Sequence, residues 1–151
     1  MTTWRPPQQI RVKVIGLAWR GDALLVVEVL DDRGRIKGLR PTGGSVAFGE
    51  SREQALDREF REELGCGVTM TGPWTVFENI YRHEGALGHE IVFAADIRLH
   101  DATLYDRDVI RFSEDDGTAC TARWLRPAAL PDGAALFPDG LAAALVHRPE
   151  R

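Results

Sequence analysis

Apolar and polar residues alternate early in the chain and then give way to an apolar run. Residues 10–18 alternate, with Ile10, Val12 and Val14 in one phase, and residues 23–30 are almost continuously apolar and rich in valine. Alternation is typical of a strand with one buried face, and an unbroken apolar run is typical of a strand covered on both faces. The charged, glycine-containing residues 31–37 predict an exposed turn after these two strands.

The clearest helical signal lies between Ser51 and Gly65. Ser51 followed by Gln54 is a capping-box start, and Gly65 is a typical helix stop. Between them, apolar residues recur at helical spacing: Ala55, Leu56, Phe60 and Leu64. The pattern therefore predicts a short amphipathic helix with one buried arc.

The second half of the chain predicts more strands and a final helix. Strands are expected at residues 75–82 and 89–99, joined by residues 83–88, and at residues 118–125, with a further short strand at 46–48. Residues 101–117 are polar and predict a long loop. Residues 136–146 are alanine-rich, with Pro138 near the start, and predict a C-terminal helix. Together these elements indicate an α+β fold with a central mixed sheet covered by helices on both faces.

Composition narrows the class of protein. A chain of 151 residues with 44% hydrophobic composition predicts one domain, here residues 10–151, preceded by a flexible arm of residues 1–9. A net charge of −4 argues against binding to a nucleic-acid polymer. Cys66 and Cys120 form no CxxC pair, and neither a membrane span nor a signal peptide is evident, so we expect a cytoplasmic protein that does not bind membranes.

Three carboxylates on the predicted helix carry the chemistry. Glu59, Glu62 and Glu63 lie close together beside the apolar arc, where like charges repel. Such runs are usually solvated helix faces. Arg52 and Arg58 are placed to offset part of the repulsion, and a divalent ion such as Mg²⁺, which prefers clustered carboxylate oxygens, would offset the rest.

Spacing decides between these readings. Gly44, Glu50, Arg58, Glu59, Glu62, Glu63 and Gly65 stand at the seven fixed positions of the Nudix box, so the chain resembles the Nudix hydrolases. Phe60 fills a hydrophobic slot of the box, and Cys66 departs mildly from the last one. The resemblance implies an α/β/α sandwich and hydrolysis of a nucleoside diphosphate linked to another moiety X.

The resemblance also implies roles for the box residues. Glu59, Glu63 and the carbonyl of Gly44 are expected to bind Mg²⁺ or Mn²⁺, with Glu62 as a further ligand or base. Arg58 and Glu50 are expected to orient the carboxylates through an ion pair. Clustered carboxylates that hold such an ion can neutralise a diphosphate and help to deprotonate water, so the chemistry agrees.

Outside the box the candidates are less specific. Arg40, next to the glycine turn, is placed to meet a phosphate oxygen, with a surface charge as the alternative. Three strand residues are candidates for polar contacts to substrate or ordinary strand residues: Glu78, Asn79 and Glu90. In the resembled family the base often lies on a loop before the last core strand. That loop here is residues 112–117, where Glu114 is the first choice of base and a solvated acidic turn is the alternative.

Several readings of function stay open on the sequence. A small nucleotide is the expected partner, but X is undetermined among nucleotide sugars, ADP-ribose, dinucleoside polyphosphates and nucleoside triphosphates. A homodimer is common in the resembled family, and the sequence does not fix the oligomeric state. The main alternative is a non-catalytic Nudix-like sensor that binds a nucleotide sugar. A Nudix-like isomerase and a structural acidic module are further alternatives.

Overall fold

The computed structural model describes residues 3–131 and 133–146. The elements run in the order β1 (Ile10–Arg20), β2 (Ala23–Leu30), β3 (Ile36–Pro41), β4 (Gly43–Ser45), α1 (Arg52–Leu64), β5 (Val68–Met70), β6 (Thr75–His83), β7 (Ala86–Leu99), the 3₁₀ helix η1 (Ala102–Asp106), β8 (Val109–Ser113), β9 (Ala119–Leu125), the 3₁₀ helix η2 (Pro127–Ala129), β10 (Ala135–Leu136) and α2 (Leu141–Val146).

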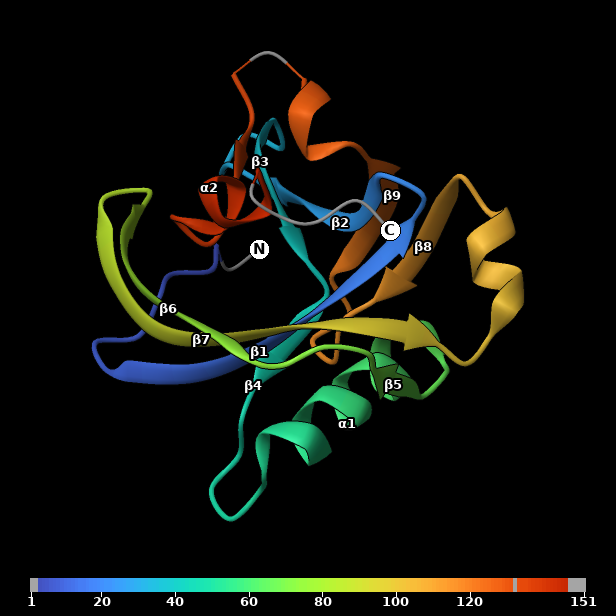
Figure 1. Cartoon of the computed structure of the whole chain (residues 1–151). Helices are drawn as coiled ribbons and strands as arrows, with labels where there is room; N and C mark the ends of the chain where they lie inside the picture. The colour runs from blue at the N-terminus through green and yellow to red at the C-terminus, as the bar shows by residue number, and fades with distance from the viewer. Residues whose placement is uncertain (1–2, 132, 147–151) are drawn as a thin grey trace.

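Strand β1 organises the sheet (Figure 1). It runs parallel to β7 and antiparallel to β4, and its last residues pair with β2. Strand β7 also pairs with β6 and β5, while β2 pairs with β3 and β9. Because β1–β7 and β3–β10 are parallel and the other pairs are antiparallel, the predicted mixed sheet is confirmed.

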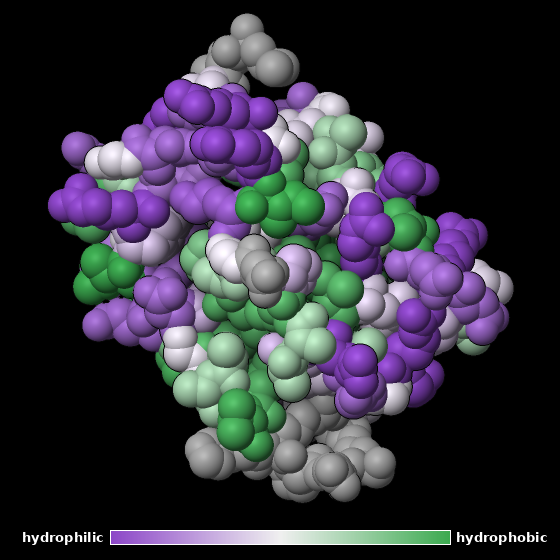
Figure 2. Space-filling view, turned by 90° about the horizontal axis from the view of Figure 1, so that it is seen from above, coloured by the Kyte–Doolittle hydropathy of each residue, from purple (hydrophilic) through white to green (hydrophobic). Residues whose placement is uncertain are grey.

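The two helices lie on opposite sides of this sheet, as predicted. Helix α1 buries Ala55, Leu56 and Phe60 in a core that includes Val14. Helix α2 contributes Leu141 to a second core that includes Ile15. Figure 1 shows α1 below the sheet and α2 above it. Seen from above, hydrophobic residues gather near the centre of the molecule, with hydrophilic residues around the margin (Figure 2). The side chains of successive residues of β1 thus pack into different cores.

Helix α1 begins and ends where the sequence predicts. Ser51 Oγ accepts a hydrogen bond from the Gln54 N–H at 3.1 Å, and Gln54 Oε1 accepts one from the Ser51 N–H at 2.9 Å. Gly65 has φ 74°, the left-handed conformation that glycine adopts freely. Leu64 is only half-buried, whereas Phe60 is fully buried. Both ends of the helix are therefore defined by local contacts.

Several expected boundaries were wrong. Residues 46–48 do not form a strand but lead into a turn at Phe48 and Gly49, because the pairing with β1 is made by β4, just before them. The connection 83–88 shrinks to Glu84 and Gly85, both with positive φ, which is the two-residue hairpin turn that matches strand twist. The C-terminal helix starts only at Leu141, after β10. Strand β5 was not predicted.

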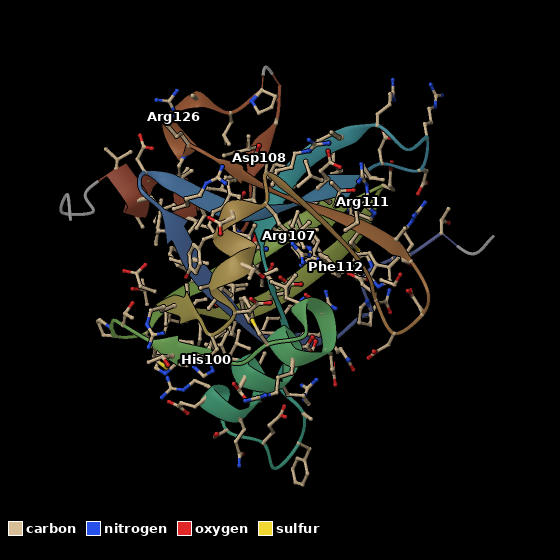
Figure 3. The ribbon with its side chains drawn as sticks, turned by 90° about the vertical axis from the view of Figure 1, so that its right-hand side faces the viewer. His100, Arg107, Asp108, Arg111, Phe112 and Arg126 are labelled. Atoms are coloured by element: carbon tan, nitrogen blue, oxygen red, sulfur yellow. The ribbon has the colours of Figure 1, made fainter. Side chains whose placement is uncertain are left out.

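Residues 101–117 are not a long loop. They contain η1 and β8, and β8 pairs with β9 over its whole length. Phe112 packs against the core next to α1, and Arg111 is exposed; Figure 3 labels both on this side of the molecule. Strand β8 has only five residues, which is too short for a clear periodic pattern, so it depends on its pairing with β9 and gave no strong local signal.

The described part of the N-terminal arm makes specific contacts. Arg5 donates to the Asp32 carboxylate, and the Trp4 ring lies 5.5 Å from the His83 ring and 5.2 Å from the Arg11 guanidinium. The flexibility of this arm and the boundaries of the domain stay predictions. No helix within the described residues is long and apolar enough to cross a membrane.

Candidate active site

A cavity of about 290 Å³ lies where β1, β4 and α1 meet the β8–β9 turn. Residues from five parts of the chain line it: Lys13, Arg40, Gly43, Gly44, Ser45, Glu59, Glu62, Glu63, Ser113, Glu114, Asp115 and Asp116. The three α1 carboxylates, the glycine turn and the predicted loop acids therefore face one space. Because phosphate oxygens need cations and water needs a base, this is the part of the described molecule that fits hydrolysis best.

Gly44 lies directly against the Glu59 carboxylate. A Cβ atom at this position would overlap both oxygens and the carboxyl carbon of Glu59. Pairing of β4 with β1, with Gly44 opposite Val14, holds the glycine in place. A side chain here would have to displace the Glu59 carboxylate, so glycine allows backbone and carboxylate oxygens to lie within one small region.

Arg58 orients the acidic face of α1. Its Nε and Nη2 donate to the two Glu50 oxygens at 2.7 and 2.9 Å, and its Nη1 donates to Glu59 Oε1 at 2.8 Å. Glu62 Oε2 lies 3.3 Å from the same nitrogen. The hydrogen bonds from Arg58 lower the pKa of Glu50 to about 2, so this bidentate pair stays charged. Arg52 instead lies over the Trp74 and Phe93 rings, so its expected part in charge balance was wrong.

Glu63 is the exception among these acids. Its Oε2 is buried and has no hydrogen-bond partner in the described residues. Burial raises the pKa of its carboxyl to about 7, and burial also raises the pKa of Glu59 despite the nearby Arg58. A buried, unpartnered carboxylate oxygen is costly unless something positive meets it. The site therefore has a place for a cation.

The oxygen atoms that line the cavity are of the chemical type that binds a hard divalent ion. Carboxylate and carbonyl oxygens are the ligands that Mg²⁺ and Mn²⁺ prefer. Among the residues that the structure describes, no three acidic, histidine or cysteine side chains already converge as a closed metal cluster. Two of the acids, Glu59 and Glu62, are turned towards Arg58. The fit thus rests on the type of donor, on the partnerless Glu63 oxygen and on the glycine contact.

Arg40 and Glu114 meet at the cavity. Arg40 Nη2 donates to Glu114 Oε1 at 3.0 Å, and both side chains are about one-third exposed. The two residues are 74 positions apart, and the β8–β9 turn brings Glu114 into place. Cys120, on β9, lies close enough to Glu114 that burial and this carboxylate raise the pKa of its thiol to about 11. The predicted base and the predicted phosphate contact are therefore paired with each other.

Lys13 is a cavity residue that the sequence analysis missed. Its side chain is 22% exposed, its nearest ion-pair partner is Glu90 Oε1 at 3.9 Å, and burial lowers its pKa. The alternation in β1 placed Lys13 in the phase opposite to Ile10, Val12 and Val14 and so gave no sign of this. Ile10 and Val12, taken as the buried phase, are 62% and 40% exposed, while Lys13 shares the phase of the buried Ile15.

The three predicted strand contacts lie outside the cavity lining. Glu78 is exposed. Asn79 and Glu90 are buried, and Glu90 accepts from Arg11 Nη2 at 2.6 Å, from Tyr81 OH at 3.2 Å and from Asn79 Nδ2 at 3.5 Å. These bonds give Asn79 and Glu90 a structural role. Contact of any of the three with substrate stays a prediction.

Comparison with known proteins agrees with this geometry. The NUDIX domain model matches residues 8–145. Nucleoside triphosphatase NudI of Escherichia coli O81 (strain ED1a) is 35% identical over 102 residues, which cover 66% of this chain and 72% of that protein. The solution structure of the Escherichia coli ORF135 protein matches with a TM-score of 0.56 and 23% identity, covering 84% of this chain and 81% of that one.

A second solved structure has the same fold. The MutT NUDIX hydrolase from Burkholderia pseudomallei matches with a TM-score of 0.53 and 20% identity, covering 92% of this chain and 98% of that one. The family model and the nucleoside triphosphatase relative define the class of enzyme as a Nudix-type pyrophosphohydrolase. With the family match over most of its length, the chain belongs to the Nudix hydrolases, enzymes that act on small nucleotide substrates.

Proposed function

We propose that this enzyme hydrolyses a phosphoric anhydride bond of a nucleoside triphosphate in a reaction that needs Mg²⁺ or Mn²⁺. The observation that carries the proposal is the partnerless Glu63 oxygen in a cavity that also holds Arg40 and Lys13. A relative at 35% identity is a nucleoside triphosphatase, which supports this choice of substrate. ADP-ribose, nucleotide sugars and dinucleoside polyphosphates are the other members of the same substrate class.

Glu59, Glu62, Glu63 and the Gly44 carbonyl would hold the divalent ion. When bound, such an ion neutralises phosphate charge and lowers the pKa of water. Arg58 fixes two of these carboxylates, since it bonds Glu59 and reaches Glu62. Glu50 in turn fixes Arg58 through two hydrogen bonds. The orientation of the acidic face is thus set before any ligand arrives.

Arg40 and Lys13 would contact the phosphate chain. Both are cationic, both line the cavity, and they come from different strands, so they can meet different oxygens. Lys13 lacks a close counter-ion, with Glu90 at 3.9 Å, and a phosphate would supply one. Charge on the substrate is therefore balanced from two sides of the cavity.

Glu114 would accept the proton of the attacking water. It is held by Arg40 in the substrate-free chain. A phosphate that binds Arg40 competes with Glu114 for the same guanidinium and leaves the carboxylate free to act as base. Substrate binding and release of the base are coupled in this arrangement.

A hydrolysis panel tests the proposal. Nucleoside triphosphates, ADP-ribose, a nucleotide sugar and a dinucleoside polyphosphate are incubated with the enzyme and Mg²⁺, and the products are identified by mass. We expect the highest kcat/KM on a nucleoside triphosphate and loss of turnover with EDTA, restored by Mg²⁺. Binding of a nucleotide sugar without cleavage of any compound would instead indicate a sensor.

Glu62→Gln is the variant for this panel, and Glu53→Gln is its control on the same helix. Glu53 accepts from Trp74 Nε1 at 3.0 Å and does not line the cavity. Loss of a carboxylate that acts on the ion or on water is expected to lower turnover at least about 10²-fold, whereas the control keeps the parental rate. Equal rates for both variants would remove Glu62 from the mechanism.

A further inference from the structure

Two hairpins of the sheet are attached to β1 in different ways. In the described chain, β2 pairs with β1 through only its first two residues, Ala23 and Leu24, and then continues into the β2–β3 hairpin. The β6–β7 hairpin is attached along β7. Figure 1 shows this hairpin at the left, apart from β3 near the centre. Since β3 carries Arg40 and β1 carries Lys13, the way the hairpins are joined bears on the catalytic cavity.

Side chains join the ends of the two hairpins. Lys37, on β3, has its Nζ 3.0 Å from Nδ1 of His83, the last residue of β6. Glu84, in the β6–β7 turn, accepts a hydrogen bond through Oε1 from the Asp32 N–H in the β2–β3 turn, at 2.8 Å. Both contacts therefore cross from one hairpin to the other.

The N-terminal arm lies across the same junction. Arg5 donates to the Asp32 carboxylate, whereas the Trp4 ring lies 5.5 Å from the His83 ring and 5.2 Å from the Arg11 guanidinium of β1. Neighbouring residues of the arm thus contact different hairpins. We use the name clasp for the six residues that make these contacts between the hairpin ends: Trp4, Arg5, Asp32, Lys37, His83 and Glu84.

The backbone of Glu84 has a conformation that is unfavourable for glutamate. Its φ is 49°, in the left-handed region, and a two-residue turn with positive φ at both positions favours asparagine or glycine first. The bond from the Asp32 N–H to the Glu84 carboxylate offsets part of this cost. A strained position held by a specific contact points to a role for the side chain.

The contact with Lys37 requires a neutral His83 ring. A lysine ammonium only donates hydrogen bonds, so His83 Nδ1 has to be the acceptor and the ring proton has to be on Nε2. A proton on Nδ1 would remove the acceptor and leave two cations 3.0 Å apart. Because His83 is only 9% exposed, water screens little of that repulsion.

We infer that the clasp is a pH-sensitive device, which a neutral His83 ring holds closed and protonation of this ring opens. Apart from Lys37, the charged groups that act on the ring include one cation, Arg5, and two anions, Asp32 and Glu84. The anions favour the proton, but burial and Lys37 outweigh them.

The direction of the pH effect follows from these surroundings. Burial, and after it Lys37, lowers the pKa of His83 from its ordinary value of 6.5 while the clasp is closed. When the clasp is open, the ring is free to take up a proton below this value. The open form then binds more protons than the closed form, so closure weakens as the pH falls through 6.5.

The test is the exchange of the Asp32 amide hydrogen with solvent, measured by NMR on the full chain. The range is about pH 7.5 to about pH 5.5, where free carboxyls keep their charge. After division by the intrinsic exchange rate, we expect opening at this amide to increase about tenfold over the range, as for a ring that titrates only in the open form. Equal protection at both ends of the range would overturn the inference.

His83→Gln removes the titrating ring, and His100→Gln is the matched control. His100 Nε2 lies 2.8 Å from Thr69 Oγ1, outside the clasp. We expect His83→Gln to remove the pH dependence of Asp32 exchange and His100→Gln to keep it. A pH dependence that persists in His83→Gln, or that is lost in His100→Gln, would assign the effect to another group and overturn the inference.

Lys37→Met tests the partner of the ring without changing the ring itself. With the ammonium removed, the pKa of His83, read from the NMR signals of its ring, should rise towards the ordinary value, and the pH dependence of Asp32 exchange should shrink. A parental pKa at or above 6.5, or a pKa that Lys37→Met leaves unchanged, would contradict the proposed device. The amide spectra of the three variants also show whether each is folded.

Discussion

Glu63 and Glu90 each place carboxylate oxygen in the interior, but their hydrogen bonding is opposite. Glu90 is surrounded by donors, with Arg11, Tyr81 and Asn79 bonded to its two oxygens. Glu63 has an oxygen with no partner among the described residues, and burial raises its pKa to about 7. Lys13 lies between them, lining the cavity of Glu63 and 3.9 Å from Glu90.

The number of hydrogen-bond donors around each carboxylate distinguishes a structural charge, Glu90, from a charge that can bind a ligand, Glu63. A satisfied buried ion pair is costly to break but does nothing further, since its partners are already present. An unsatisfied carboxylate destabilises the chain until a cation or a proton reaches it. Natural proteins accept such a cost at functional sites. The same Glu→Gln change should therefore have different consequences at these two positions.

Glu63→Gln is expected to have the largest effect on activity. It removes charge from the proposed ion site without emptying a core position, so turnover with saturating Mg²⁺ should fall at least about 10²-fold. The melting temperature of the metal-free protein should not fall, because an unfavourable buried charge is removed. Steady-state kinetics and thermal melts measure the two effects, and a rate near that of the parent would exclude Glu63 as a ligand.

Glu114→Gln tests the base. If Glu114 accepts the proton of water, turnover should fall by about 10²-fold or more, in the range for general-base catalysis, while Mg²⁺ affinity changes little. The acidic limb of the pH–rate profile should also change. Asp115→Asn and Asp116→Asn test the other two acids of the same turn. Parental rates and pH profiles in Glu114→Gln, Asp115→Asn and Asp116→Asn would leave the base within α1.

Glu90→Gln is expected to act on stability instead. It leaves the Arg11 guanidinium without its buried counter-ion, which should lower the free energy of unfolding by about 3 kcal/mol. Urea denaturation measures this loss. Turnover of the folded fraction should stay close to parental. A raised KM would support the predicted contact between Glu90 and substrate, and an unchanged KM would leave only the structural role.

The last effect is the pH dependence that Glu63 contributes to stability. Its carboxyl has a pKa of about 7 in the folded chain against an ordinary value of 4.5, so the folded state holds a proton that the unfolded state has lost between these values. The stability of the metal-free parent, relative to Glu63→Gln, should fall as pH rises from 4.5 to 7. Urea midpoints across this range measure the difference, and Mg²⁺ should reduce it above pH 7. Parallel curves for both proteins would contradict the assignment.

Local signals explain which parts of the fold could be predicted. Helix α1 has a capping box, a glycine stop and an apolar repeat within 15 residues, so its bounds needed no tertiary information. Strand β8 and residues 46–48 were misassigned because short strands depend on pairing partners distant in sequence. The mixed sheet itself followed from the order of the longer elements.

The site divides in the same way. The box residues were found by spacing, and the structure brings Gly44, Glu59, Glu62 and Glu63 to one cavity. Lys13 was missed because the buried phase of a strand depends on what covers each face, and α1 stops short of Ile10 and Val12. The Arg40–Glu114 pair joins side chains 74 residues apart and has no local signature. Contacts of this kind depend on the packed sheet and not on any one segment.

Gly44 has a consequence for handling the enzyme. The Glu59 carboxylate occupies the space that a Cβ atom on residue 44 would need. A single methyl group on residue 44 would therefore move the carboxylate without altering any charge in the cavity. A chain carrying Gly44→Ala keeps Arg40, Lys13 and the acids of α1, yet Glu59, one of the ligands proposed above, is displaced. If the proposed metal site is right, we expect such a chain to bind a nucleotide without cleaving it, because the change affects the position of one carboxylate and not the cations of the cavity.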